Sequence, residues 1–182
     1  INSKSAEVYG VELELKKSLE EYYSLLEGFR IGGNLTWSQS EVSLTDIELD
    51  LFPAPSNIKS YNALNVADRM TRELEGQSEW IFTIDLSYEN EDLGILSTIV
   101  YSYYGTRLNA AAYQYPEDLW EDGFSSLDFI TSYTFGTENW KFKFSAKNLT
   151  AEDRIVRIRN TNAIRRKFQT PRIFSLSLEK SF

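Results

Sequence analysis

The 182 residues contain no histidine and no cysteine. Without these side chains the chain cannot form a Ser-His-Asp triad, a cysteine nucleophile, a thiolate zinc site or a disulfide. The chain also lacks excess positive charge, since 27 acidic and 19 basic residues give a net charge of −8. Nucleic-acid binding needs a concentrated basic surface. We therefore expect no enzymatic activity, no cofactor, no metal site and no nucleic-acid partner.

Long apolar runs are missing too, so no segment could span a membrane as a helix. The mean hydropathy of −0.38 is that of a soluble protein. The opening residues, INSKSAEVYG, do not have the basic start and apolar run of a signal peptide. Aromatic residues, however, reach 14%, with eleven Tyr and eleven Phe. A mean value conceals any alternation of apolar and polar residues, which has to be sought along the chain.

Apolar residues recur at every second position, the period of a β-strand with one apolar face. The clearest case is EWIFTIDLSYEN (79–90), where Phe82 and its alternate neighbours are apolar and Asp85 belongs to the polar set. In residues 94–106 both sets hold Tyr and aliphatic residues, so the facing of that strand is left open. The seven predicted strands are residues 6–15, 29–42, 79–90, 94–108, 127–135, 140–148 and 171–182.

The connections between these strands differ in length. In chain order they are residues 17–28, 43–78, 90–92, 107–126, 136–139 and 149–170. Every second connection of an up-and-down meander lies on the same side, so all the longest loops project from one rim and the tight turns from the other. This asymmetry is typical of outer-membrane barrels.

Aromatic residues stand near the strand ends. Phe29 begins one strand and Trp37 lies toward its far end, while Trp80 opens the next and Tyr88 closes it. A bilayer favours aromatic rings at both of its interfaces. The opposite face carries charged residues, which a hydrated lumen accepts and a protein core does not. The pattern therefore favours an antiparallel, all-β, up-and-down transmembrane barrel over a soluble β-sandwich.

Closure of the barrel poses a problem, because open sheet edges are excluded in hydrocarbon. Seven strands place the two chain ends on opposite rims. Single-chain bacterial barrels have even strand counts, with both ends on the short-turn side. We therefore expect residues 1–182 to be the C-terminal part of a larger barrel whose earlier strands lie outside this chain.

Several stretches in a fixed order carry a family resemblance. They are AEVYGVELEL, RELEGQSEWIFTIDLSYEN, YSYYGTRL, WKFKFSAKNLT and PRIFSLSLEKSF. Along nearly its whole length the chain resembles the C-terminal third of the barrel of TonB-dependent outer-membrane receptors, especially those of Bacteroidetes-type bacteria. The resemblance implies seven strands of a 22-stranded barrel around an N-terminal plug. It also implies import of a scarce ligand such as a siderophore, haem, a vitamin or an oligosaccharide, with energy delivered through TonB.

The partners implied by the resemblance are outer-membrane lipid, the remainder of the barrel and its plug, the TonB complex and the barrel-assembly machinery. Two alternatives remain open: a barrel that works without TonB, such as a porin or adhesin, and a soluble all-β ligand-binding module. The location implied is the bacterial outer membrane.

The last residues resemble the signal that barrel-assembly machinery recognises. Phe174, Leu176, Leu178 and Phe182 would form one lipid-facing row that ends on an aromatic residue. Lys180 stands where this signal usually has an aromatic residue, and near the interface its amine can reach water.

The last long connection is the only basic concentration in the chain, and it is predicted to be a hairpin with its tip at 160–162. Its basic residues are Arg154, Arg157, Arg159, Arg165, Arg166 and Lys167. Guanidinium groups suit phosphate or carboxylate, so the hairpin is a candidate contact for lipopolysaccharide or an anionic ligand. Cross-strand pairing with acidic residues of neighbouring loops is the alternative that we favour.

Residues 109–124 combine Tyr113, Tyr115 and Trp120 with acidic residues. These rings could stack on a sugar, a haem or an aromatic chelator, or could pack the loop against its neighbours, and both interpretations are left open. Asp46, Glu48 and Asp50 could share one face and hold calcium, but they lack the turn glycine of a tight calcium loop, so a solvated acidic loop is favoured.

Residues 19–29, LEEYYSLLEGF, place apolar side chains near helical spacing. A short amphipathic turn at the periplasmic rim would result, with its apolar residues packed against the core. These residues are Leu19, Tyr22, Tyr23 and Leu26.

Overall fold

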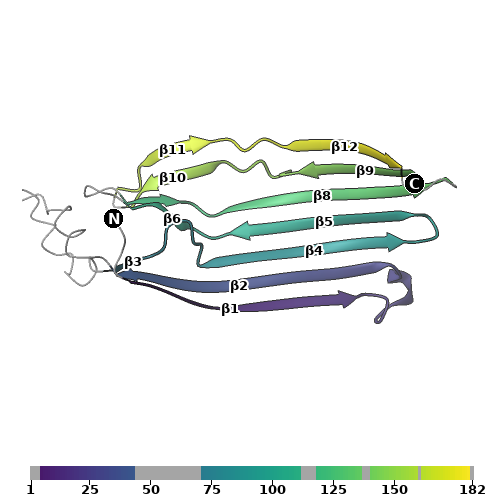
Figure 1. Cartoon of the computed structure of the whole chain (residues 1–182), viewed down its shortest axis with the longest axis horizontal. Helices are drawn as coiled ribbons and strands as arrows, with labels where there is room; N and C mark the ends of the chain where they lie inside the picture. The colour runs from purple at the N-terminus through teal and green to yellow at the C-terminus, as the bar shows by residue number, and fades with distance from the viewer. Residues whose placement is uncertain (1–4, 44–70, 112–117, 137–139, 160, 181–182) are drawn as a thin grey trace, which may run out of the picture.

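The computed structural model describes residues 5–43, 71–111, 118–136, 140–159 and 161–180, and it consists of antiparallel β-strands (Figure 1). The 3-10 helix η1 (Ser24–Leu26) is the only helical element in these ranges. No helix in them is long and apolar enough to cross a membrane. The strands are β1 (Ser5–Ser18), β2 (Phe29–Ser43), β3 (Thr71–Arg72), β4 (Trp80–Asn90), β5 (Ile95–Tyr104), β6 (Arg107–Ala110), β7 (Leu119–Glu121), β8 (Phe124–Phe135), β9 (Trp140–Lys147), β10 (Arg154–Ile158), β11 (Ile164–Phe168) and β12 (Ile173–Lys180).

The main sheet contains the seven long strands that the sequence predicts. Their spatial order is β1-β2-β4-β5-β8-β9-β12, and each strand pairs antiparallel with its neighbour, while β3 pairs with the end of β2. Consecutive long strands are therefore spatial neighbours, and the predicted up-and-down meander is confirmed. β1 and β12 are the two edges, and no pairing joins them among the described residues.

The connections are segregated as predicted. The tight turn 91–94 and the connection 19–28 that contains η1 lie at one end of the sheet, where β8 also ends and β9 begins (Figure 1). The three longest connections leave from the other end. Gly94 has a left-handed φ of 67°, and the side chain of Asn90 accepts the backbone N–H of Leu93, so local residues build the β4–β5 turn.

Strand register places the alternating apolar residues on one common face. Leu13 is opposite Leu35, and Leu35 is opposite Phe82. Across the whole sheet, this apolar face includes Val11, Leu13, Leu15, Ile31, Leu35, Trp37, Trp80, Phe82, Ile84, Leu86, Phe129, Tyr133, Phe142, Phe144, Phe174, Leu176 and Leu178. Within the part of the chain that the structure describes, no second layer covers this face, because all elements in extensive contact are neighbours within a sheet. Leu13 is accordingly 62% exposed and Leu176 is 69% exposed.

The facing of residues 94–106, which the sequence leaves open, follows from pairing with β4. Phe82 is opposite Tyr103, Ile84 is opposite Tyr101, and Leu86 is opposite Ile99. These three β5 residues therefore belong to the apolar face. The other set of β5, with Thr98 and Ser102 among its members, belongs to the polar face, where both hydroxyls contact hydroxyls of β4.

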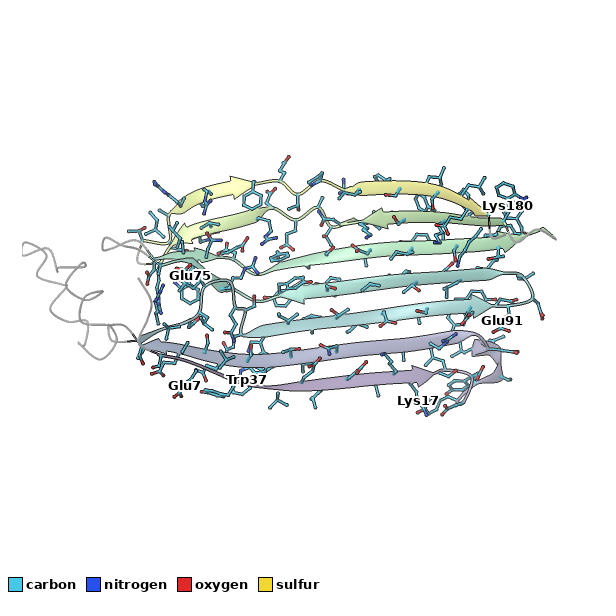
Figure 2. All side chains as sticks on the ribbon, viewed as in Figure 1. Glu7, Lys17, Trp37, Glu75, Glu91 and Lys180 are labelled. Atoms are coloured by element: carbon cyan, nitrogen blue, oxygen red, sulfur yellow. The ribbon has the colours of Figure 1, made fainter. Side chains whose placement is uncertain are left out.

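Aromatic pairs mark both ends of the apolar face. Trp37 and Trp80 are opposite one another near the long-connection end, with ring centroids 6.2 Å apart. Phe29 and Tyr88 form the corresponding pair at the other end, with centroids 4.7 Å apart. Figure 2 shows Trp37 toward the end that carries the longest connections and Lys180 at the opposite end.

Two predictions need correction. The fourth strand ends at Tyr104 rather than at residue 108, because Gly105 turns the chain and donates its N–H to the carbonyl of Trp80 at 2.8 Å. Tyr22 and Tyr23 do not pack against a core: they are 64% and 70% exposed. The turn that contains them extends beyond the strand ends, where the sheet offers no apolar layer for them to join.

Candidate functional site

A second, four-stranded sheet stands at the long-connection end of the main sheet (Figure 1). Its order is β11-β10-β7-β6, and all its pairings are antiparallel. The predicted hairpin in the last long connection is confirmed as β10–β11. Its partners β6 and β7 come from the connection between β5 and β8, so two long connections combine into one folded unit above the main sheet.

A buried carboxylate lies at the centre of this second sheet. Glu121 is 2% exposed and stands opposite Arg107 on β6 and Val156 on β10. Oε2 of Glu121 is 2.8 Å from Nε and Nη2 of Arg107. Oε1 is 2.7 Å from Nε and 2.5 Å from Nη2 of Arg154. One carboxylate thus binds two guanidinium forks and fastens β6 and β10 to β7.

Glu121, Arg107 and Arg154 form an ion triad. Aromatic rings of the main sheet contact its two arginines. The guanidinium carbon of Arg154 lies 3.5 Å from the ring centroid of Phe124, and that of Arg107 lies 5.9 Å from it. Phe124 in turn stacks on Tyr104 with centroids 4.9 Å apart. Phe124 and Tyr104 are paired across β8 and β5 on the polar face. The triad therefore caps the polar face at its long-connection end.

The remaining basic residues of the hairpin have varied contacts. Arg157 is paired with Asp122 at 2.7 Å, and Lys167 with Asp153 at 2.8 Å. The other three arginines contact no carboxylate among the described residues. Arg159 lies over the Trp120 ring at 4.8 Å, Arg166 donates to Asn109 at 2.9 Å, and Arg165 is exposed on the irregular part of β11. The structure thus brings Arg154 and Arg157 to acidic partners, whereas Arg159, Arg165 and Arg166 form no ion pair within the described ranges.

The aromatic candidates are only partly described. Trp120 lies on β7 opposite Arg157, and its buried Nε1 has no hydrogen-bond partner among the described residues. Tyr113 and Tyr115 lie outside the described residues. So do the calcium candidates Asp46, Glu48 and Asp50. The described ranges contain no cluster of three or more residues able to ligate a metal ion.

The polar face of the main sheet carries hydrogen-bonded polar and charged side chains. Asn34 donates to Glu12 at 2.5 Å, and Lys143 donates to Glu179 at 2.7 Å. The carboxylate of Asp85 occupies the space where a side chain on Gly32 would lie, since the two residues are opposite one another. Gly32 therefore provides room for the carboxylate of Asp85 on the polar face. The Asn34–Glu12 and Lys143–Glu179 pairs join neighbouring strands of the sheet, and no described element packs over this part of the polar face.

Near the second sheet, one carboxyl group has a shifted pKa. Partial burial raises the pKa of Glu73, which follows β3. Arg159 acts in the opposite direction, and Glu79 adds a smaller upward effect. The protonated form of Glu73 is therefore favoured in the folded protein relative to a free carboxyl group.

The terminal strand presents the expected row. Phe174, Leu176 and Leu178 share the apolar face and are 62%, 69% and 58% exposed. Phe182 lies outside the described residues. Lys180 is on the same face, with its amine 5.3 Å from the ring centroid of Trp140. The side chain of this lysine therefore lies beside an aromatic ring at the short-turn end of the sheet.

Sequence reasoning did not identify Glu121 or Arg107 as functional. β7 has only three residues and β6 only four, so neither shows an alternating pattern. The one available signal is the excess of arginine in residues 154–166, which indicates buried or neighbouring acidic partners.

Comparison with known proteins places the chain in a family. The family model described as "TonB dependent receptor-like, beta-barrel" matches residues 1–149. No curated protein and no solved structure matches the chain. Members of the matched family are outer-membrane receptor and transporter barrels, not typically enzymes. The exposed apolar face, the polar opposite face and the segregated connections agree with this match. The chain belongs to the family of TonB-dependent receptor β-barrels.

Proposed function

We propose that this chain forms part of the barrel wall of a receptor that imports a scarce ligand across the bacterial outer membrane, driven by TonB and without enzymatic activity. The observation that supports this most is the uncovered apolar face across seven strands, with aromatic pairs at both ends. Phe29 and Trp37 are eight positions apart on β2. This separation is roughly 27 Å along the strand and, with a tilt of about 40°, roughly 20 Å across a bilayer.

The second sheet would then stand on the extracellular side, where ligands arrive, because barrels of this kind have short periplasmic turns and long external loops. We assign the ligand or lipopolysaccharide contact to Arg159, Arg165 and Arg166, which have no carboxylate partner among the described residues. Trp120, with Tyr113 and Tyr115 of the same connection, would supply aromatic contacts. Arg154 and Arg157 would chiefly hold this surface in shape, since acidic residues bind them.

The open edges of the main sheet support a larger barrel. The outer backbone groups of β1 and β12 need partners if both strands lie in lipid. We propose that further strands of the same receptor pair with both edges and that a plug fills the lumen and couples to TonB. The row of Phe174, Leu176, Leu178 and Phe182 would direct the chain to the barrel-assembly machinery.

The proposal is tested in a strain deleted for the full-length receptor and grown with a panel of candidate ligands, namely siderophores, haem, vitamins and oligosaccharides. We expect the receptor in the outer-membrane fraction and at least one ligand whose uptake needs both the receptor and TonB. Recovery in the soluble fraction would overturn the membrane location. Uptake that persists without TonB would identify a porin-like barrel instead.

The contact residues are tested by the double variant R165A/R166A, with K16A/K17A, which removes two basic side chains at the short-turn end of β1, as the matched control. We expect weaker binding of an anionic ligand or of lipopolysaccharide by the double variant, with normal amounts in the membrane. Equal binding by the double variant and the wild type would contradict the assignment. Purified ligand and purified lipopolysaccharide, used in separate binding measurements, distinguish the two sources of negative charge.

A further inference from the structure

The apolar face of the main sheet has a groove toward its short-turn end. The groove has a volume of about 480 Å³ and is lined by Leu93, Ile95, Ser97, Thr131, Ser132 and Tyr133. Ser97 and Thr131 lie opposite one another on β5 and β8. They are small polar residues at positions where the neighbouring rows of the same face carry large apolar side chains.

Register defines the walls of the groove. On one side of the Ser97–Thr131 pair lies the pair Ile99–Phe129, and on the other side lies the pair Ile95–Tyr133. Across the strands, the same row continues to Tyr88 on β4 and to Phe144 on β9. Two short side chains are thus surrounded by taller ones, which leaves a depression rather than a bulge.

The floor of the groove is compatible with an apolar occupant. The hydroxyl oxygens of Ser97 and Thr131 are 2.7 Å apart, so one hydroxyl hydrogen-bonds to the other. A polar group facing hydrocarbon is costly unless it has such a partner. The mutual hydrogen bond reduces the polarity that the two residues present outward, while Ile95, Leu93 and Tyr133 supply apolar walls.

The depth of the groove follows from its place on the strand. Ser97 is three positions beyond Gly94, the last residue of the β4–β5 turn, and is thus roughly 10 Å from the strand end. In an outer-membrane barrel this end faces the periplasm, and Ser97 is opposite Tyr88, whose ring marks the interface at this end, so the groove lies at the headgroup end of the acyl chains of the inner leaflet.

We infer that this groove binds one acyl chain of an inner-leaflet phospholipid. The inference rests on the membrane location proposed above. The small side chains of Ser97 and Thr131 lie between rows of large side chains, and a flexible hydrocarbon chain can fill the space above them. Lipid is the medium that surrounds this face, so acyl chains are always present there. A groove occupied in this way holds a lipid longer than the surrounding surface does. Its specificity resides in shape and not in charge, because no charged side chain lines it.

The experiment uses the full-length receptor in vesicles of phosphatidylethanolamine that contain a small fraction of the same lipid with a photoreactive diazirine near the carboxyl end of one acyl chain. After illumination, the labelled peptides are identified by mass spectrometry. We expect severalfold enrichment of label on residues 93–97 and 131–133 over other peptides of the apolar face. An even distribution of label over that face would overturn the inference.

Three variants sharpen the test. T131F should fill the groove and abolish the enrichment, while T131V keeps the shape without the hydroxyl and should retain it. I84F is the matched control, because it adds the same side chain to the apolar face outside the groove. Enrichment that survives in T131F, or is lost equally in I84F, would contradict the assignment. Failure of the wild-type receptor to insert into the vesicles at all would refute the membrane location instead.

Discussion

Oε1 of Glu121 lies 2.7 Å from Nε and 2.5 Å from Nη2 of Arg154, although β7 and β10 come from different long connections. The second carboxylate oxygen binds Arg107 in the same way. Because Glu121 is buried, its loss leaves two cations without their counter-charge. The second sheet therefore depends on one acidic residue that no sequence pattern singles out.

We expect Glu121→Gln to destabilise the second sheet by about 3–5 kcal/mol, the usual cost of breaking a buried ion pair. Hydrogen exchange of residues 107–110 and 154–158 should accelerate, while the main sheet keeps its protection. Asp122→Asn is the matched control. It also loses an arginine partner, but Asp122 and Arg157 are 37% and 29% exposed, so the expected cost is at most about 1 kcal/mol. Equal acceleration in the two variants would contradict a central role for Glu121.

Charge on the apolar face should be more costly than charge on the polar face. Ile84 is 50% exposed on the apolar face, and the preceding residue, Thr83, belongs to the polar face. Ile84→Lys should lower the free energy of unfolding from lipid vesicles by about 2–4 kcal/mol if it lies near the bilayer midplane. Thr83→Lys should have little effect, because its amine can reach the hydrated lumen. Urea titration of the vesicle-inserted receptor measures both, and equal losses would argue that neither face contacts lipid.

The tight-turn glycines should differ in their tolerance of alanine. Gly94 and Gly136 both have a left-handed φ, of 67° and 74°, which costs an alanine about 1–2 kcal/mol. A Cβ on Gly94 would also collide with the backbone carbonyl of Thr134, whereas no described atom lies within 4 Å of a Cβ on Gly136. Gly94→Ala should therefore destabilise the barrel more than Gly136→Ala does, as measured by refolding yield and urea midpoint. The reverse order would mean that Gly94 does not lie against Thr134 in the membrane-inserted receptor.

The raised pKa of Glu73 predicts a local dependence on pH. Its folded-state pKa lies above the unfolded value of about 4.5, so its favourable contribution is complete below that value and is lost as pH rises through the folded pKa. Hydrogen exchange of residues 71–78 should be slower at pH 5 than at pH 7.5, after correction for intrinsic exchange rates. Glu73→Gln should reduce this difference. If the difference in exchange rate between pH 5 and pH 7.5 is unchanged in the variant, a group other than Glu73 causes the pH dependence.

The main sheet could be predicted from sequence because each strand carries its own signal. The alternation around Phe82 and around Phe142 sets the face of β4 and β9 without reference to any neighbour. β5 is ambiguous because Val100 and Tyr104 add apolar residues to its polar set. Only pairing with β4, which places Tyr101 opposite Ile84, settles its facing. Register is a property of two strands, and a single segment does not contain it.

The second sheet could be predicted only in part. The β10–β11 hairpin is local, and its turn and flanking residues indicate it. β7 pairs with β10 across more than thirty residues of sequence, and three residues are too few for a periodic pattern. The contacts of Arg154 follow from neither strand alone. The sequence predicts pairing with an acidic residue as a class of contact, but it does not identify Glu121 as the partner.

The most direct test of the membrane-barrel assignment uses single cysteines, since residues 1–182 contain none. Any cysteine elsewhere in the full-length protein is replaced, and single cysteines are introduced in turn at residues 81–87. Each cysteine is labelled with a nitroxide in the vesicle-inserted receptor. The relaxation of the nitroxide by oxygen and by a water-soluble nickel complex is then measured. We expect residues 82, 84 and 86 to be relaxed by oxygen, and residues 81, 83, 85 and 87 by the nickel complex. If 82, 84 and 86 are shielded from both reagents, the apolar face is buried against protein and does not face lipid.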